Sequence, residues 1–155
     1  RHPSIAPFEA FKTKDSHIII AAGNDKLFEN LCNFLKIPEI SKDTKFITNS
    51  KRSENMDELK IILENKLKEK KTSEWVKGME ELKIPCGPIF NIKEAVENPQ
   101  IKERNMIVKS FHKVVGEFRT AGNPIKMSSY NDDSTRGDIP DLDEHRDKII
   151  KEFCN

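Results

Sequence analysis

The sequence predicts an α+β fold in which short antiparallel hairpins pack with a cluster of helices. Two β-branched or alternating segments flank a polar turn near the N-terminus, amphipathic segments of helical spacing follow, and a second hairpin pattern appears in the later part. Hairpins and helices in this succession, without a regular alternation of strand and helix, are typical of α+β proteins. At 155 residues the chain is long enough for one domain with an appendage.

The composition predicts a small core under a densely charged surface. Hydrophobic residues make up 35% of the chain and charged residues 34%, and 27 Lys and Arg nearly balance 26 Asp and Glu. A chain without a basic excess lacks the usual means of binding a phosphate backbone, so we expect no nucleic-acid partner. The longest apolar run, residues 17–22, is far shorter than the roughly 18 residues of a membrane-spanning helix, so we expect no membrane segment.

Three cysteines indicate a cytoplasmic protein. Cys32, Cys86 and Cys154 are an odd number with long spacings, which suits neither a disulfide framework nor a metal clip. Reduced thiols in the cytoplasm are the simple interpretation. Cys32 lies beside a predicted apolar stripe, and we interpret it as a small core residue.

The first elements are a hairpin and a helix. Residues 8–13 and 17–22 read as two strands around a polar turn. Asn24 or Asp25 can then cap a helix over residues 25–36. The apolar residues that recur at helical spacing in it are Leu27, Phe28, Leu31, Phe34 and Leu35.

A polar stretch separates this helix from two more. A turn at Pro38–Ile40 leads into a loop that extends to about Arg52. Ser53 is a candidate cap for the second helix, and Thr72 starts the third, in which we expect Trp75 to anchor the core. The apolar stripes are Met56, Leu59, Ile62, Leu63 and Leu67 in the second helix, and Trp75, Val76, Met79 and Leu82 in the third.

Two prolines around a glycine break the chain at Pro85, Cys86, Gly87 and Pro88. This sequence excludes a helix and suits either a tight turn or an extended crossing. An exposed Cys86 in a rigid turn would be reactive, but no His or Arg lies next to it in the sequence. We therefore favour a role of these residues in backbone geometry over thiol chemistry.

The later part begins with short helices and a second hairpin. Residues 92–97 form a short helix that Asn98-Pro99 stops, and residues 100–105 make another brief helical turn. Residues 106–111 and 117–120 flank a turn and are expected to pair as strands.

The C-terminal stretch contains a candidate strand over residues 125–128, a polar loop over residues 131–137 and a terminal helix over residues 144–153. The residues of this helix expected to face inward are Ile149, Ile150 and Phe153.

Motifs of general enzyme chemistry are missing from the sequence. There is no P-loop, no Gly-x-Gly-x-x-Gly, no His-Glu-x-x-His and no nucleophile elbow. The four histidines, His2, His17, His112 and His145, are not paired at ligand spacing, so we expect no metal site.

Five blocks of the chain, in a consistent order, carry a family resemblance. Ile84-Pro85-Cys86-Gly87-Pro88 is the most specific, because the family places a Pro-Cys/Tyr-Gly-Pro turn there. The other blocks are residues 2–15, 17–28, 98–108 and 115–128. Together they resemble the family III CoA-transferases, the group of formyl-CoA and carnitine CoA-transferases and of alpha-methylacyl-CoA racemase.

The resemblance implies a larger enzyme of which this chain is the C-terminal portion. Residues 1–110 would be its small domain, and residues 111–155 would return to a Rossmann-like large domain built with an N-terminal half. The opening Arg1, which is not an initiator Met, fits this expectation. Members of the family form interlocked homodimers, so the implied partners are the N-terminal half and a second copy.

The resemblance also implies the reaction. An Asp outside this chain attacks an acyl-CoA, and CoA passes through an aspartyl-CoA intermediate to a free carboxylic acid. The coenzyme A thioester is a substrate, and no prosthetic group is implied. No catalytic residue is expected in this chain, which alone should be inactive. The family's small domain forms a lid near the thioester, so His2 and Ser4 are expected to be active-site neighbours.

Asn24 bears on which member of the family the chain resembles. Racemases carry a Glu of an acid–base network in the block that matches Gly23-Asn24-Asp25. Asn cannot shuttle protons, so this departure favours a transferase and makes Asn24 a third active-site neighbour.

Three other functions remain open from the sequence. One is a fragment of an alpha-methylacyl-CoA racemase. Another is a non-catalytic remnant or dimerisation domain from a split gene, which the altered tail at residues 141–146 favours because it departs from the family's Leu-Leu-Gly-Glu-His-Thr. The last, based on composition alone, is a small helical interaction module unrelated to CoA.

Overall fold

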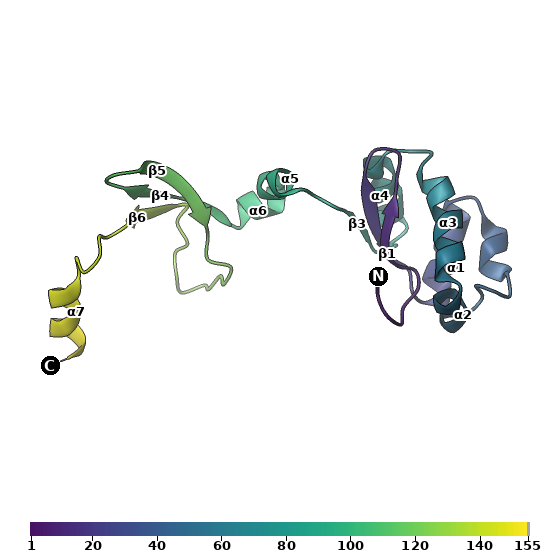
Figure 1. The fold of residues 1–155 in the computed structure, drawn as a ribbon, viewed down its shortest axis with the longest axis horizontal. Helices are drawn as coiled ribbons and strands as arrows, with labels where there is room; N and C mark the ends of the chain where they lie inside the picture. The colour runs from purple at the N-terminus through teal and green to yellow at the C-terminus, as the bar shows by residue number, and fades with distance from the viewer. Residues whose placement is uncertain (155) are drawn as a thin grey trace. The chain divides into compact units, whose positions relative to one another are not determined.

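The computed structural model describes residues 1–154, which form two compact units (Figure 1). The first unit is Arg1–Ile89, and the second begins at Phe90. The predicted division between residues 110 and 111 rests on the family resemblance and stays a prediction.

The first unit is built on a three-stranded antiparallel sheet. The strands are β1 (Phe8–Lys12), β2 (His17–Ala21) and β3 (Cys86–Pro88), in the order β1-β2-β3. The predicted hairpin is thus confirmed. Of the two expectations for residues 85–88, the extended crossing is correct, because Cys86 pairs with Ile20 in the sheet.

Helices cover one face of this sheet. They are α1 (Asp25–Phe34), the 3-10 helix η1 (Pro38–Lys42), α2 (Asn49–Glu54), α3 (Met56–Leu67) and α4 (Thr72–Glu81). The stripes predicted for residues 25–36, 56–67 and 72–82 therefore mark real helices.

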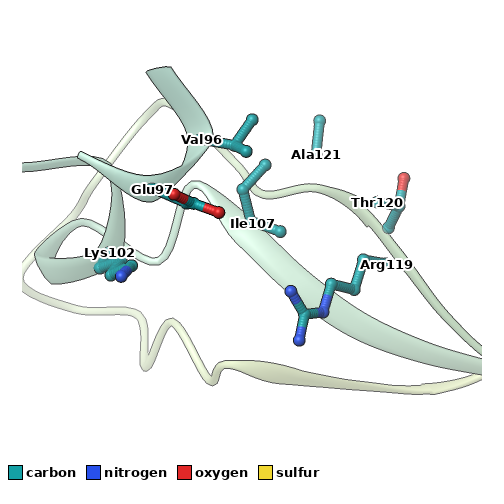
Figure 2. A pocket seen from close by; sticks show the side chains of 7 residues that line it. All are labelled: Val96, Glu97, Lys102, Ile107, Arg119, Thr120 and Ala121. Carbon is teal, nitrogen blue, oxygen red and sulfur yellow. The ribbon is translucent and has the colours of Figure 1, made fainter. Parts of the chain in front are cut away.

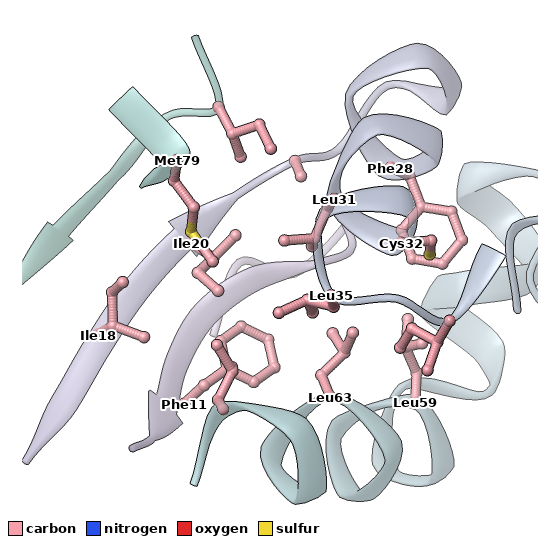
Figure 3. Close-up of a cluster of buried hydrophobic side chains, with 14 of the residues drawn as sticks. Phe11, Ile18, Ile20, Phe28, Leu31, Cys32, Leu35, Leu59, Leu63 and Met79 are labelled. Carbon is pink, nitrogen blue, oxygen red and sulfur yellow. The ribbon is translucent and has the colours of Figure 1, made fainter. Parts of the chain in front are cut away.

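The core lies between the sheet and these helices (Figure 3). Phe11, Ile18 and Ile20 are fully buried, whereas Ile19 between them is exposed, as expected for a strand with one covered face. Leu31 of α1 and Leu63 of α3 pack into the same cluster. This burial of apolar surface is the main force that holds the unit together.

Trp75 and Cys32 confirm their predicted core roles. Trp75 is 4% exposed, its Nε1 donates to the Leu67 carbonyl at 2.7 Å, and Phe34 meets its ring edge-on. Cys32 is fully buried, and desolvation raises the pKa of its thiol to about 12. Such a thiol stays protonated and unreactive at neutral pH.

The prediction of an unbroken loop up to Arg52 was wrong. The stretch contains η1 and α2, and Thr48 caps α2 by accepting a hydrogen bond from the Lys51 amide. Ser53 lies inside α2 and does not cap the next helix, which begins after Asn55.

The second unit combines two short helices, a small sheet and a terminal helix. The helices are α5 (Ile92–Glu97), α6 (Pro99–Glu103) and α7 (Arg146–Phe153). The strands are β4 (Ile107–His112), β5 (Gly116–Ala121) and β6 (Thr135–Asp138), in the order β5-β4-β6. The hairpin of β4 and β5 is antiparallel as predicted, and β6 joins β4 in parallel.

Close backbone packing requires a glycine at position 122 of the second unit. Gly122 follows β5, and a Cβ built on it would lie 2.0 Å from the backbone oxygen of Asn105. The Gly122 amide also donates to the Met106 carbonyl at 2.9 Å. Only glycine fits here without a backbone shift.

The structure corrects three expectations in the C-terminal stretch. Residues 125–128 are not a strand, and most of β6 lies in the stretch that was expected to be loop. The pairing of β6 with β4 relies on backbone groups rather than on an apolar pattern. Just before β6, for example, the Ser134 carbonyl accepts a hydrogen bond from the Lys109 amide of β4 at 2.9 Å. In α7 the residues expected to face inward are exposed: Ile149 at 53%, Ile150 at 47% and Phe153 at 74%.

None of the helices within residues 1–154 is long and apolar enough to cross a membrane.

Candidate functional site

The N-terminal segment folds back onto β1. The His2 ring stacks on Phe8 with 5.4 Å between centroids, and the His2 amide donates to the Phe8 carbonyl at 2.9 Å. The Nδ1 atom of His2 accepts a hydrogen bond from the Ser4 amide at 3.2 Å. The two expected active-site neighbours are therefore joined in one loop with a defined shape.

Asn24 lies in the turn between β2 and α1. Its Oδ1 accepts a hydrogen bond from the Leu27 amide at 2.8 Å, so it caps α1, as one of the two predicted candidates. The side chain of Asp25 is engaged elsewhere, because its Oδ1 accepts from Arg52 at 2.9 Å.

A pocket of about 430 Å³ is lined by residues of both regions. Its lining is mostly apolar, and it brings the segment around Ile5 next to the turn around Asn24. Of the three expected active-site neighbours, Asn24 lines this pocket, whereas His2 stacks on the lining residue Phe8 and Ser4 precedes the lining residue Ile5. The lining residues are Ile5, Phe8, Ala21, Gly23, Asn24, Leu27 and Asn49.

Gly23 permits the close approach of the two walls. A Cβ built on Gly23 would lie 2.1 Å from Cγ2 of Ile5. The Ala22 amide also donates to the Pro7 carbonyl at 2.9 Å. The segment before β1 and the turn after β2 are thus packed directly against each other.

Two residues of α2 support the pocket, and sequence reasoning missed both. Asn49 and Arg52 make hydrogen bonds to the backbone of the walls. The sign of this helix that the sequence offered was Thr48, because threonine is common at helix N-termini. Nothing in the sequence marks Arg52 as buried, because arginine is almost always exposed.

The Pro85–Pro88 segment lies beside β2 and outside this pocket. The Pro85 carbonyl accepts from the Ala21 amide at 2.9 Å, at the end of β2 that leads to Asn24. Partial burial, and secondarily the charge of Glu80, raise the pKa of the Cys86 thiol. These contacts suit a structural segment rather than a nucleophile.

A larger pocket of about 640 Å³ lies in the second unit (Figure 2). Figure 2 shows the basic side chains of Lys102 and Arg119 and the carboxylate of Glu97 among the residues that line it. None of the predicted site residues lines it. Within the described residues, no group of three or more His, Cys, Asp or Glu is arranged to hold a metal ion.

Comparison with known proteins identifies the family. A family model described as CoA-transferase family III matches residues 1–146. Acetyl-CoA:oxalate CoA-transferase from Acetobacter aceti is 38% identical over 154 residues, which cover 99% of this chain and 38% of that protein. Human succinyl-CoA:glutarate CoA-transferase is 35% identical over 151 residues, which cover 97% of this chain and 34% of that protein.

A solved structure agrees. The crystal structure of a CAIB/BAIF family protein from Brucella suis matches with a TM-score of 0.76 and 33% identity, covering 97% of this chain and 38% of that one. The chain belongs to CoA-transferase family III, and the resemblance seen in the sequence is confirmed. It spans a little over a third of the length of these relatives.

Proposed function

We propose that this chain is the C-terminal portion of an acyl-CoA:carboxylate CoA-transferase. The observation that carries the proposal is the 38% identity, over 99% of the chain, to an enzyme named for CoA transfer to a carboxylate. A second relative, 35% identical, is named for the same class of reaction.

The pocket supports transfer over racemisation. The position that carries a Glu in racemases is Asn24, whose amide neither takes up nor releases protons near neutral pH. The carboxylate of Asp25 is held by Arg52 at 2.9 Å. Neither residue is thus set up as a base for an α-proton.

The proposed reaction proceeds by covalent catalysis at an Asp outside this chain. The Asp carboxylate attacks the thioester carbonyl, the C–S bond breaks, and a mixed anhydride and CoA thiolate form. The thiolate then attacks the aspartyl carbonyl, which releases the donor acid and leaves aspartyl-CoA. The acceptor carboxylate repeats these two steps in reverse and departs as its CoA thioester, so no water is consumed.

Within this scheme His2, Ser4 and Asn24 are proposed neighbours of the reacting thioester. The pocket that Asn24 lines, and that His2 and Ser4 adjoin through Phe8 and Ile5, would hold the acyl group, since its lining is mostly apolar. Pro85, Cys86, Gly87 and Pro88 would keep β2, and with it the Asn24 turn, in place.

We further propose that residues 111–155 complete a Rossmann-like large domain with an N-terminal half, in an interlocked homodimer. The exposed apolar side chains of α7 support this proposal, because a helix with such a face needs a partner. The three free cysteines support a cytoplasmic location.

The test uses the native polypeptide that carries this chain, with an acyl-CoA and a free carboxylic acid in D2O. We expect the acceptor acid to become a CoA thioester without deuterium at the α-carbon of the donor. Deuterium incorporation without a new thioester would instead indicate a racemase. The 155-residue chain alone is expected to give no turnover, and steady-state transfer by the pure chain would contradict the proposal.

A further inference from the structure

Arg52 is a fully buried cation that ties three distant segments together. Its exposure is 0%, and its guanidinium lies 4.6 Å from the centre of the Phe28 ring. It donates to the carbonyls of Ala6 at 2.7 Å, Gly23 at 2.7 Å and Phe46 at 3.0 Å. The bond to Asp25 adds the charge partner that a buried guanidinium requires.

Asn49, one turn earlier in α2, makes two hydrogen bonds to the same N-terminal segment. Its Nδ2 donates to the Ser4 carbonyl at 2.8 Å, and its Oδ1 accepts from the Ala6 amide at 3.0 Å. Both ends of the side-chain amide are therefore used by backbone groups. Asn49 lines the pocket, but as a support of its wall rather than as a free hydrogen-bonding group.

Together the two side chains set the spacing of the pocket walls. One wall is the segment Ser4–Ala6, and the other is the turn Gly23–Asp25. Arg52 bonds to both walls, and Asn49 fixes the first against α2. The loop at Ser4 has its own internal bond to His2, so holding Ser4–Ala6 also holds His2.

We propose that Asn49 and Arg52 are positioning residues of the transfer reaction, which act by clamping the two pocket walls at a fixed separation. The inference rests on the proposed function. Neither residue needs to touch the reacting atoms, because a wall displaced by about 1 Å can lower a rate about a hundredfold.

The test compares Asn49→Ala with Asn55→Ala in the native polypeptide. Asn55 is a matched control, since it is also half-buried, flanks α2 and donates two side-chain hydrogen bonds to the backbone, at Lys45 and Lys51. Neither Lys45 nor Lys51 lines the pocket. We therefore expect the two variants to lose similar amounts of folding free energy, and only Asn49→Ala to disturb the pocket walls.

For Asn49→Ala we expect kcat/KM for the acceptor acid to fall at least about tenfold. Inhibition by free CoA should change less than about twofold, because the resemblance places most CoA contacts outside this chain. Asn55→Ala should leave both values near those of the wild type. The proposal would be overturned if the two variants had equal kcat/KM for the acid. It would also be overturned if Asn49→Ala lowered the affinity for CoA by the same factor as kcat/KM for the acid.

Hydrogen exchange gives a second readout that does not depend on turnover. The Ala6 amide donates to Asn49, so its exchange should accelerate in Asn49→Ala and not in Asn55→Ala. Unchanged exchange at Ala6 would show that no clamp exists. A wild type that transfers CoA to no acid would overturn the proposed function, whereas an active wild type with an unaffected Asn49→Ala would overturn only the positioning role.

Discussion

Replacing Arg52 with Met is expected to lower the free energy of unfolding of the first unit by about 2–6 kcal/mol. Methionine matches the length of the stem but donates no hydrogen bond. The carbonyls of Ala6, Gly23 and Phe46 would each lose a donor, and the first and last of these bonds are buried. Each buried carbonyl left without a partner costs about 1–3 kcal/mol.

Urea unfolding followed by Trp75 fluorescence measures this loss, because Trp75 is the one tryptophan of the chain and is buried in the first unit. Lys45→Met is the surface control. Lys45 pairs with Glu58 at 2.9 Å in an exposed position, where an ion pair contributes little, so Lys45→Met should unfold close to the wild type. An Arg52→Met variant as stable as Lys45→Met would refute the role of Arg52.

Phe11→Ala is expected to destabilise the same unit by about 3–5 kcal/mol. Phe11 is a fully buried residue of β1, paired with Ile18 and packed against the helices (Figure 3). Truncation leaves a cavity whose walls belong to several elements, so it cannot collapse without moving the sheet. The same urea titration reports the loss as a lower midpoint with an unchanged slope.

Phe8→Ala is the matched control, since Phe8 is on the same strand but 36% exposed. It should lose less than half as much stability, because it removes less buried surface and leaves an open hollow rather than a closed cavity. Equal losses for Phe8→Ala and Phe11→Ala would mean that the core is not where the structure places it.

Apolar periodicity explains how much of the fold the sequence predicts. The helices α1, α3 and α4 carry buried apolar stripes, and exposed and buried residues alternate along β2. In these elements the spacing of apolar residues in the sequence therefore indicates which side chains are buried. The helix α2 carries no such stripe, since its residues are all polar and its one buried side chain is Arg52. Likewise β6, Thr135–Asp138, pairs through its backbone, which leaves no mark on residue type.

The candidate site was predictable to the extent that its residues have local roles or a family pattern. Asn24 was one of two predicted cap candidates, and it is the cap of α1. The places of His2, Ser4 and Asn24 beside the reacting thioester come from the resemblance and stay predictions. Asn49 and Arg52 were missed for a physical reason. Their partners are mostly backbone groups of Ser4, Ala6, Gly23 and Phe46, which any sequence would supply, so only the folded chain shows that they converge.

The most direct test of the proposed function is the intact mass of the native polypeptide that carries this chain, measured after incubation with an acyl-CoA. We predict a covalent CoA adduct, outside residues 1–155, that hydroxylamine removes and that a free carboxylic acid discharges as a new acyl-CoA. A polypeptide that remains unmodified by every acyl-CoA tested would contradict the assignment as a CoA-transferase that works through an aspartyl-CoA intermediate.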